Sequence, residues 1–557
     1  MSKNLRPLLA AIAVAVAAFY LLRSFTRREA PAFSQQQALR VLDAKPAWSV
    51  GQPITPQVLV PMSAVTPPLV VGAQPKTVQP SNQPRDVIPG EYMLRFFNTA
   101  DLERFVRLLE ARGGHVLDRG VLGDTLRIRL NDARMLETLM REGPTPVEFA
   151  YNIYVRTPPV EFRDPRPPEG GYVAFGSRAM EWLGAPADRS SWGKGLLVAV
   201  LDSGVVENPS LWANEVRRIN LLEDSGSAVH GTEVAAIIAG VGADAQGVSP
   251  QAQLLSIQVL NAEGVGDVFT LARGIVVAVD QGAKIINLSL GSMETGFILR
   301  DALDYARRKD VAVVAASGNE AVDGLLYPAA YDDVIAVGAV DAAGRQTYFS
   351  NRGDTLDVTA PGVGVATAVP MTDGGLFSGT SASTPFVSGA LAYLFSRDPN
   401  LSVAEATQIL RQCSDDGGAP GWDPEYGYGM LNLRRLTQWN TPGIYDIGAG
   451  DVTLTRTEGT ADPLVQVPVQ NRGTEPLTDV SLTVNMDGGQ HQMHFYDLKP
   501  GETRWESIPF SRERLNQMGV VTIEYEAAIS GRTDAYPNDN ARRTVFSLKP
   551  VHPQAQN

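Results

Sequence analysis

Three residues that together can transfer an acyl group stand at well-separated points of this chain. The stretch FSGTSASTPFVSG at residues 377–389 holds Ser381 among several other hydroxyl side chains. A serine hydroxyl is unreactive at its ordinary pKa, so it needs a base, and the base needs a group that orients it. His230 in HGTEVAAIIAG and Asp202 in VAVLDSG are of the right types for these two roles. The three residues together indicate nucleophilic catalysis by Ser381.

The segments around these residues predict one edge of a parallel sheet. The runs LLVAVLDSG, AQLLSIQVL, KIINLSLGS, VAVVAASGN and DVIAVGAV are apolar and β-branched, which is typical of parallel strands covered on both faces by helices. Active sites in such α/β folds lie at the carboxyl ends of the strands. Asp202 ends its strand, whereas His230 and Ser381 each stand at the start of an apolar helix. The free N–H groups of a helix start favour developing negative charge.

Each residue alone has an ordinary structural interpretation. Asp202 in DSG suits a turn, and Asn319 in ASGN suits a left-handed turn position. His230 and Glu233 have the spacing of a metal pair, but no second histidine lies nearby. The glycines of residues 240–242 imitate part of a dinucleotide-binding motif, but they follow a predicted helix and therefore predict a turn. Only the combination of these features favours a catalytic site.

The motifs DSG, HGTEVA, SLG, ASGN and GTSASTP occur in this order and resemble those of the subtilisin-like serine peptidases, the subtilases. The resemblance spans about residues 176–440, and the order Asp, His, Ser is that of subtilisin. It implies that Ser381 is the nucleophile, that His230 is the general base, and that Asp202 orients the imidazole. It also implies that the side chain of Asn319 donates to the oxyanion, together with the backbone N–H of Ser381.

The same resemblance implies where a polypeptide substrate binds. Ser289, Leu290 and Gly291 match one backbone segment that pairs with an extended peptide, and the Gly264-Val265-Gly266 stretch matches the other. Leu326 precedes a Tyr-Pro pair, where the family forms the floor of the primary specificity pocket. We expect Leu326 to make this pocket shallow and to favour small residues before the scissile bond.

Residues 86–157 predict a small domain of the order βαββαβ, which is ferredoxin-like. Its first helix, in TADLERFVRLLEARGG, places Leu102, Phe105, Val106 and Leu109 on one face. The position of this domain, directly before the catalytic region, resembles that of a subtilase propeptide. The resemblance implies an intramolecular inhibitor, with processing around Arg156–Arg178. A permanently attached accessory domain is the alternative.

Composition excludes several other classes of function. The chain has 557 residues, of which 44% are hydrophobic and 20% charged, so two to four globular units are expected. The formal net charge of −13 gives no general attraction to nucleic acids or anionic lipids. The single cysteine, Cys413, cannot form an internal disulfide or a thiolate-clustered metal site, and we expect it to be a buried hydrophobic residue.

The first residues predict export from the cytoplasm. Residues 1–29 carry basic residues on both sides of an apolar run from Leu8 to Leu22, which suits a signal peptide or a signal anchor. The protein is therefore expected to be extracytoplasmic, either secreted or held by a single membrane span. Residues 30–85 contain ten of the 38 prolines and the run Gln35-Gln36-Gln37, which predicts an extended linker.

The remaining domains are predicted to be a catalytic domain at 158–440 and an antiparallel β-sandwich at 441–550. Alternating strands such as LVQVPVQN and VVTIEYEA indicate the sandwich. It resembles bacterial adhesion-type (CARDB-like) immunoglobulin-like domains, which implies a surface partner or a spacer. The whole chain is thus expected to be an α/β peptidase domain between a ferredoxin-like domain and a sandwich.

The principal hypothesis is an exported serine endopeptidase made as a zymogen. The alternative is a non-catalytic adhesion or binding protein on a subtilase scaffold. A third interpretation, a Ser-Glu-Asp acid peptidase, shares SGTS, but His230 argues against it because those enzymes use a carboxylate as the base. The hypothesis requires no cofactor, and the resemblance allows a structural calcium ion whose ligands the sequence does not single out.

Overall fold

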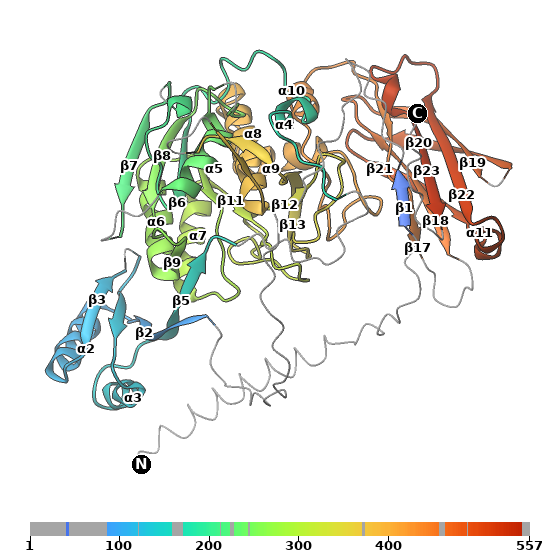
Figure 1. Ribbon diagram of the computed structural model, residues 1–557. Helices are drawn as coiled ribbons and strands as arrows, with labels where there is room; N and C mark the ends of the chain where they lie inside the picture. The colour runs from blue at the N-terminus through green and yellow to red at the C-terminus, as the bar shows by residue number, and fades with distance from the viewer. Residues whose placement is uncertain are drawn as a thin grey trace, which may run out of the picture.

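The computed structural model describes residues 40–43, 86–120, 122–158, 171–211, 213–222, 228–242, 245–369, 374–455, 463–486 and 488–547. These residues form three regions along the chain, drawn in blue to teal, in green to gold, and in orange to red in Figure 1. The predicted signal segment and most of the predicted linker lie outside the described residues.

The middle region is built on a parallel sheet with the strand order β13-β12-β11-β10-β6-β8-β7. Its strands are β6 (Leu197–Asp202), β7 (Val216–Asn220), β8 (Gln253–Gln258), β10 (Ile285–Leu288), β11 (Ala312–Ala316), β12 (Ile335–Val340) and β13 (Leu356–Pro361). The five apolar runs of the sequence form β6, β8, β10, β11 and β12, so the predicted parallel sheet is confirmed.

The two edge strands, β7 and β13, are not predicted from the sequence, because neither is a plain apolar run. β7 exposes Arg217 and Arg218 to solvent. β13 carries the buried Asp357, which accepts hydrogen bonds from the guanidinium of Arg411 at 2.6 and 2.9 Å. An edge strand has a neighbour on one side only, so polar residues are tolerated there more readily than in the centre.

Helices cover both faces of the sheet (Figure 1). Val198 and Val200 of β6 belong to the core shared with α5 (Val229–Ala239) and α8 (Thr380–Arg397). Leu197, Ala199 and Leu201 point to the opposite face, in the core shared with α6 (Val268–Asp280) and α7 (Phe297–Arg308). Alternate residues of a strand point to opposite faces, and both faces are dry here, which explains why the strand is apolar throughout.

Shorter elements complete this region. They are α4 (Ala179–Trp182), β9 (Val265–Asp267), β14 (Val365–Thr367), β15 (Gly375–Phe377), α9 (Val403–Gln412), α10 (Leu433–Gln438) and a 3₁₀ turn at Pro209–Leu211. Cys413 follows α9 and is buried, as expected, and burial raises the pKa of its thiol to about 11.

The position of Pro385 leaves one backbone carbonyl of α8 without a helical partner. A proline in the first turn of a helix would cost little, but α8 begins at Thr380 and Pro385 lies in its second turn. Proline has no N–H, so it cannot donate to the carbonyl of Ser381 four residues earlier. That carbonyl instead accepts a hydrogen bond from the hydroxyl of Ser289, at 3.0 Å.

The first region has the element order βαββαβ and the sheet order β3-β4-β2-β5. Its elements are β2 (Val87–Arg95), α2 (Thr99–Ala111), β3 (His115–Arg119), β4 (Thr125–Arg129), α3 (Ala133–Glu142) and β5 (Glu148–Arg156). Helix α2 buries the four residues that its spacing predicts, Leu102, Phe105, Val106 and Leu109. Its N-cap is Asn98, whose side-chain oxygen accepts from the backbone N–H of Asp101. This element order is the one that defines the ferredoxin-like unit.

The last region contains two antiparallel sheets around one apolar core. Its elements are β16 (Ile447–Ala449), β17 (Thr453–Thr455), β18 (Leu464–Asn471), β19 (Leu477–Met486), β20 (Gly489–Leu498), β21 (Thr503–Pro509), α11 (Arg512–Met518), β22 (Val520–Ile529), a 3₁₀ turn at Pro537–Asp539, and β23 (Ala541–Ser547). Four residues of the predicted linker form β1 (Arg40–Asp43), which pairs with β23.

A buried ionic network joins the last region to the middle one. Arg472 of the last region donates to Asp539 at 2.7 Å and lies 3.7 Å from Asp415 of the middle region. Asp415 also pairs with Arg435 at 2.9 Å. Asp446 is buried beside them, and burial together with the charge of Asp539 raises its pKa to about 7.

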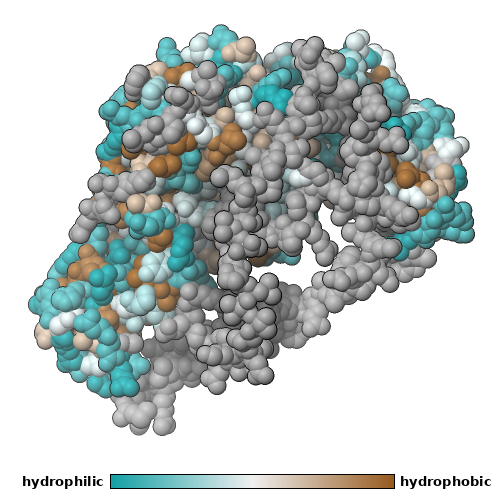
Figure 2. Space-filling view, viewed as in Figure 1, coloured by the Kyte–Doolittle hydropathy of each residue, from teal (hydrophilic) through white to brown (hydrophobic). Residues whose placement is uncertain are grey.

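The surface of the described residues in Figure 2 mixes hydrophilic and hydrophobic residues on this side. Among the residues whose structure is described, none of the helices combines the length and apolar character needed to cross a membrane.

Candidate active site

Asp202 and His230 meet at the carboxyl end of β6. The imidazole Nδ1 of His230 lies 2.9 Å from both carboxylate oxygens of Asp202, which is fully buried. His230 is in the first turn of α5, and Gly231 allows that turn to approach the loop after β6. A Cβ atom on Gly231 would lie 2.1 Å from the carbonyl oxygen of Gly204. A glycine is therefore required directly after His230 for the helix to approach this loop so closely.

The surroundings of His230 favour its protonated form. Burial lowers the pKa of the imidazole, but the charge and hydrogen bond of Asp202 and the charge of Glu233 outweigh burial, so the pKa lies above its ordinary value of 6.5. Burial raises the pKa of Glu233 to about 7. Phe377 packs edge-on against the imidazole, with ring centroids 5.2 Å apart. The contacts with Asp202 and Phe377 fix the orientation of the imidazole. A raised pKa suits a general base, whose pKa should lie near the pH at which it works.

Ser381 lies in the first turn of α8, at the same end of the sheet. Gly379 is the N-cap, with φ = 117°, a conformation that only glycine adopts readily. The hydroxyl of Ser381 donates to the carbonyl oxygen of Ser289 at 3.2 Å. Among the described residues, Ser381 and His230 share no hydrogen bond. Ser381 and His230 thus lie on neighbouring helix starts without a hydrogen bond between them.

Asn319 follows β11 and is anchored to the start of α8. Its side-chain oxygen accepts from the backbone N–H of Thr380 at 3.0 Å and from the hydroxyl of Thr380 at 2.9 Å. These two bonds orient the amide nitrogen outward, where it donates to the carbonyl oxygen of Pro158 at 2.9 Å. The carbonyl oxygen of Pro158 therefore lies where an oxyanion would accept a hydrogen bond from Asn319.

Two backbone segments hold an extended stretch of the chain itself. Strand β9 pairs with β5, and the N–H of Thr157 donates to the carbonyl of Gly264 at 3.0 Å. On the other side, Arg156 and Gly291 exchange both backbone hydrogen bonds at 2.9 Å. The segments around Gly264 and Gly291 are the ones that the sequence indicates for peptide binding. Leu290 contributes backbone only, since its side chain lies in the core between the sheet, α6 and α7.

Leu326 is buried beside the two glycines that flank this site. A Cβ atom on Gly291 would lie 2.7 Å from the Cβ of Leu326, and one on Gly318 would lie 2.7 Å from its Cγ. The leucine side chain therefore lies between Gly291 and Gly318 and takes up the space there.

A chain of polar side chains that the sequence motifs do not predict lies beneath Ser381. Ser388 donates to the side-chain oxygen of Asn287 at 2.8 Å, and the amide of Asn287 donates to the hydroxyl of Ser289 at 3.0 Å. Ser289 in turn donates to the carbonyl of Ser381. Asn287 in the otherwise apolar run KIINLSLGS was the one available signal, because a buried polar residue needs a partner.

Within the described part of the chain, no three His, Cys, Asp or Glu side chains form a group that could hold a metal ion. The residues gathered at the site are those of acyl transfer: a hydroxyl, an imidazole paired with a carboxylate, and an amide donor.

Comparison with known proteins agrees with this chemistry. The sequence pattern of the subtilase family (Peptidase_S8) matches residues 193–429. Subtilisin Savinase of Lederbergia lenta is 36% identical over 262 residues, which cover 46% of this chain and 96% of that protein. An alkaline protease of Alkalihalobacillus alcalophilus is also 36% identical over 262 residues, covering 46% of this chain and 68% of that protein.

One solved structure extends the likeness beyond the middle region. It is fervidolysin from Fervidobacterium pennivorans, described as a keratinolytic enzyme related to subtilisin. The TM-score is 0.56 at 22% sequence identity, and the match covers 80% of this chain and 72% of that one. At this identity the likeness shows a shared fold, the subtilisin-like α/β fold with its parallel sheet.

Proposed function

This chain belongs to the subtilase family and is a serine endopeptidase, and we propose that Ser381, His230 and Asp202 carry out its reaction. The hydroxyl oxygen of Ser381 attacks the carbonyl carbon of a polypeptide substrate, and the amine leaves as an acyl-enzyme forms. His230 accepts the hydroxyl proton and delivers it to the leaving nitrogen, while Asp202 stabilises the imidazolium. The contact of His230 with both oxygens of Asp202 is the observation that carries the proposal.

Two donors would stabilise the developing oxyanion. One is the side-chain amide of Asn319, which already holds a carbonyl oxygen at 2.9 Å. The other is the backbone N–H of Ser381, which lies in the first turn of α8, where N–H groups have no partner within the helix. Before attack, the hydroxyl of Ser381 has to turn from the carbonyl of Ser289 toward His230. Such catalytic hydrogen bonds often form only with substrate in place.

We propose that the cleft prefers a small residue directly before the scissile bond. Leu326 fills the space between Gly291 and Gly318, where a larger side chain would need room. This steric argument supports the shallow pocket expected from the sequence.

We propose that the protein is made as a zymogen and that residues 86–157 act as an intramolecular inhibitor. Strand β5 pairs with β9, and the following residues lie against Gly264, Gly291 and Asn319. A polypeptide substrate would need the same backbone groups, so the two cannot bind together.

We propose export through residues 1–29, with the enzyme either secreted or kept at the membrane by this segment, and a binding role for the C-terminal sandwich toward a surface partner. The identification as an endopeptidase takes the place of the non-catalytic adhesion hypothesis.

Fluorophosphonate labelling tests the catalytic assignment. The full chain is labelled before and after limited digestion with thermolysin, a metallopeptidase that the probe does not modify. We expect the digested wild type to be labelled and Ser381→Ala to remain unlabelled. Ser378→Ala is the matched control, because Ser378 lies three residues earlier and only accepts a hydrogen bond from the N–H of Gly364. Equal labelling of wild type and Ser381→Ala, or no labelling of either, would refute the proposal.

A further inference from the structure

The segment held between Gly264 and Gly291 presents one particular peptide bond to Ser381. Arg156 exchanges both backbone hydrogen bonds with Gly291, so in an antiparallel register Pro158 stands opposite Ser289. The carbonyl oxygen of Pro158 accepts the amide of Asn319. The carbonyl carbon of Pro158 is therefore the one offered for attack, and the bond that would break joins Pro158 to Pro159.

The first proline changes the hydrogen bonding of the nucleophile. A residue opposite Ser289 would normally donate its backbone N–H to the carbonyl of Ser289. Pro158 has no N–H, and that carbonyl accepts the hydroxyl of Ser381 instead, at 3.2 Å. The proton of the nucleophile thus points to an acceptor that cannot remove it, and Ser381 makes no hydrogen bond to His230.

The second proline is a poor leaving group in this reaction. Cleavage would form a bond between Oγ of Ser381 and the carbonyl carbon of Pro158, break the bond to the nitrogen of Pro159, and transfer the proton from His230 to that nitrogen. In proline the nitrogen carries a ring carbon where other residues carry hydrogen. His230 would therefore have to protonate a backbone nitrogen that is more crowded than that of any other residue type.

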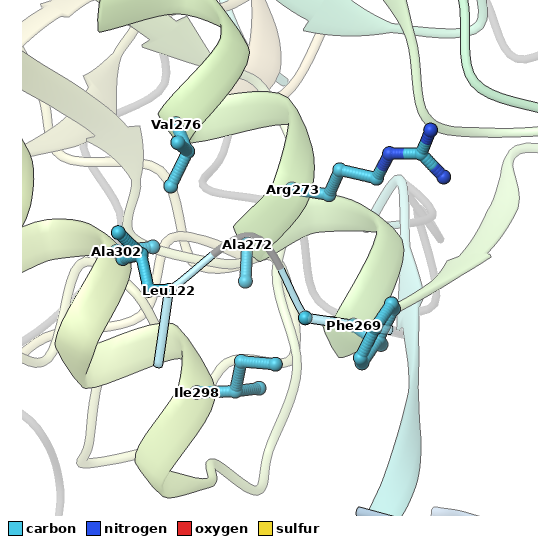
Figure 3. Close-up of a pocket in the computed structure, with 8 residues that line it drawn as sticks. Leu122, Phe269, Ala272, Arg273, Val276, Ile298 and Ala302 are labelled. Atoms are coloured by element: carbon cyan, nitrogen blue, oxygen red, sulfur yellow. The ribbon is translucent and has the colours of Figure 1, made fainter. Parts of the chain in front are cut away.

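Contacts away from Asn319 and Gly291 hold the domain in place. Leu122 packs against the core that contains Ala272 of α6 and Ala302 of α7, and these residues line a small pocket between the domain and the two helices (Figure 3). Asp118 pairs with Arg273 at 2.8 Å. The fully buried Asn152 accepts from the backbone N–H of Phe269 at the start of α6, at 3.3 Å. The strand in the cleft is thus the end of a docked domain rather than a loose tail.

We infer that residues 86–158 are a resident inhibitor that the enzyme does not release by cutting the bond over its own nucleophile. The Pro158-Pro159 pair blocks self-cleavage at that bond, and activation starts with a cut elsewhere in the chain by another peptidase. This inference rests on the proposed function, and it excludes one bond from the region around Arg156–Arg178 in which the sequence predicts processing.

N-terminal sequencing and intact mass of the purified full chain test the inference. Pro158→Ala/Pro159→Ser is compared with wild type and with Pro167→Ala/Pro168→Ser, the same change at a second Pro-Pro pair nine residues further along. Each is also made with Ser381→Ala. We expect only Pro158→Ala/Pro159→Ser to give a chain that begins at residue 159, and this product to disappear with Ser381→Ala.

Two results would overturn the inference while leaving the proposed function intact. One is a wild-type chain that begins at residue 159 whenever Ser381 is present. The other is a Pro158→Ala/Pro159→Ser chain that stays intact at this bond although it is labelled by the fluorophosphonate after thermolysin treatment. Failure of the proposed function looks different, since then no variant is labelled even after thermolysin has removed the domain.

Discussion

The side-chain nitrogen of Asn319 lies 2.9 Å from the carbonyl oxygen of Pro158, although 161 residues separate the two in the chain. This contact joins the end of the first domain to the residue that the sequence predicts as an oxyanion donor. The two residues therefore belong to one hydrogen-bonded arrangement, and substitutions on either side have measurable effects.

Asn319→Ala should lower kcat by roughly 10²–10³ and leave KM nearly unchanged, because the donor stabilises charge that develops only in the transition state. Steady-state kinetics on a chromogenic peptide, after thermolysin treatment, measures both constants. A variant with raised KM and unchanged kcat would show that Asn319 binds substrate only.

Glu233→Gln should move the acidic limb of the kcat/KM profile to lower pH. His230 must be neutral to accept the proton of Ser381, and the negative charge of Glu233, which is present once the pH exceeds the pKa of Glu233 of about 7, raises the pKa of His230. Removing that charge lowers this pKa, so the neutral imidazole appears at lower pH. The control is Glu215→Gln, since Glu215 precedes β7 and lies at the opposite end of the sheet. A limb that moves to higher pH would contradict the argument.

Leu326→Ala should widen the primary pocket. We expect the ratio of kcat/KM for phenylalanine over alanine before the scissile bond to rise roughly 10- to 200-fold, the usual gain from accommodating added apolar volume. A peptide library read out by mass spectrometry measures the ratio. Leu325→Ala, at the neighbouring and less buried position, should leave the ratio unchanged. Equal ratios in wild type and Leu326→Ala would place the pocket elsewhere.

Leu122→Ala should loosen the first domain. Losing the apolar contacts of a half-buried leucine costs about 1.4 kcal/mol, which corresponds to roughly tenfold weaker docking. The full chain should then react about tenfold faster with a fluorophosphonate without thermolysin. Leu117→Ala, an exposed leucine on the same domain, is the matched control. Unchanged labelling of Leu122→Ala would show that this leucine does not contribute to docking of the domain.

Asp446→Asn should flatten the pH dependence of stability. The folded-state pKa of Asp446 is about 7, above the ordinary value of 3.8, so its stabilising contribution is complete below about pH 4 and is lost as the pH rises through 7. Urea unfolding in a Ser381→Ala background, which prevents self-digestion, measures the free energy of unfolding. Asp497→Asn, at an exposed site, should keep the wild-type slope, and an identical slope in Asp446→Asn would refute the assignment.

Local residue patterns were sufficient to predict the central elements of the fold and the types of group at the site. Apolar, β-branched runs determine β6, β8, β10, β11 and β12, because a strand buried on both faces cannot carry polar residues. The spacing of Leu102, Phe105, Val106 and Leu109 determines the buried face of α2 for a similar reason. The order of the Asp, His and Ser motifs indicates the reaction class.

Tertiary structure alone decided which of these groups touch. The edge strands β7 and β13 lack a distinctive pattern because only one side of each is paired. The bond from Ser289 to the carbonyl of Ser381 exists because Pro385 leaves that carbonyl free within α8. The contact of Pro158 with Asn319 depends on how the first domain docks on α6 and α7, a long-range packing result that no stretch of sequence encodes by itself.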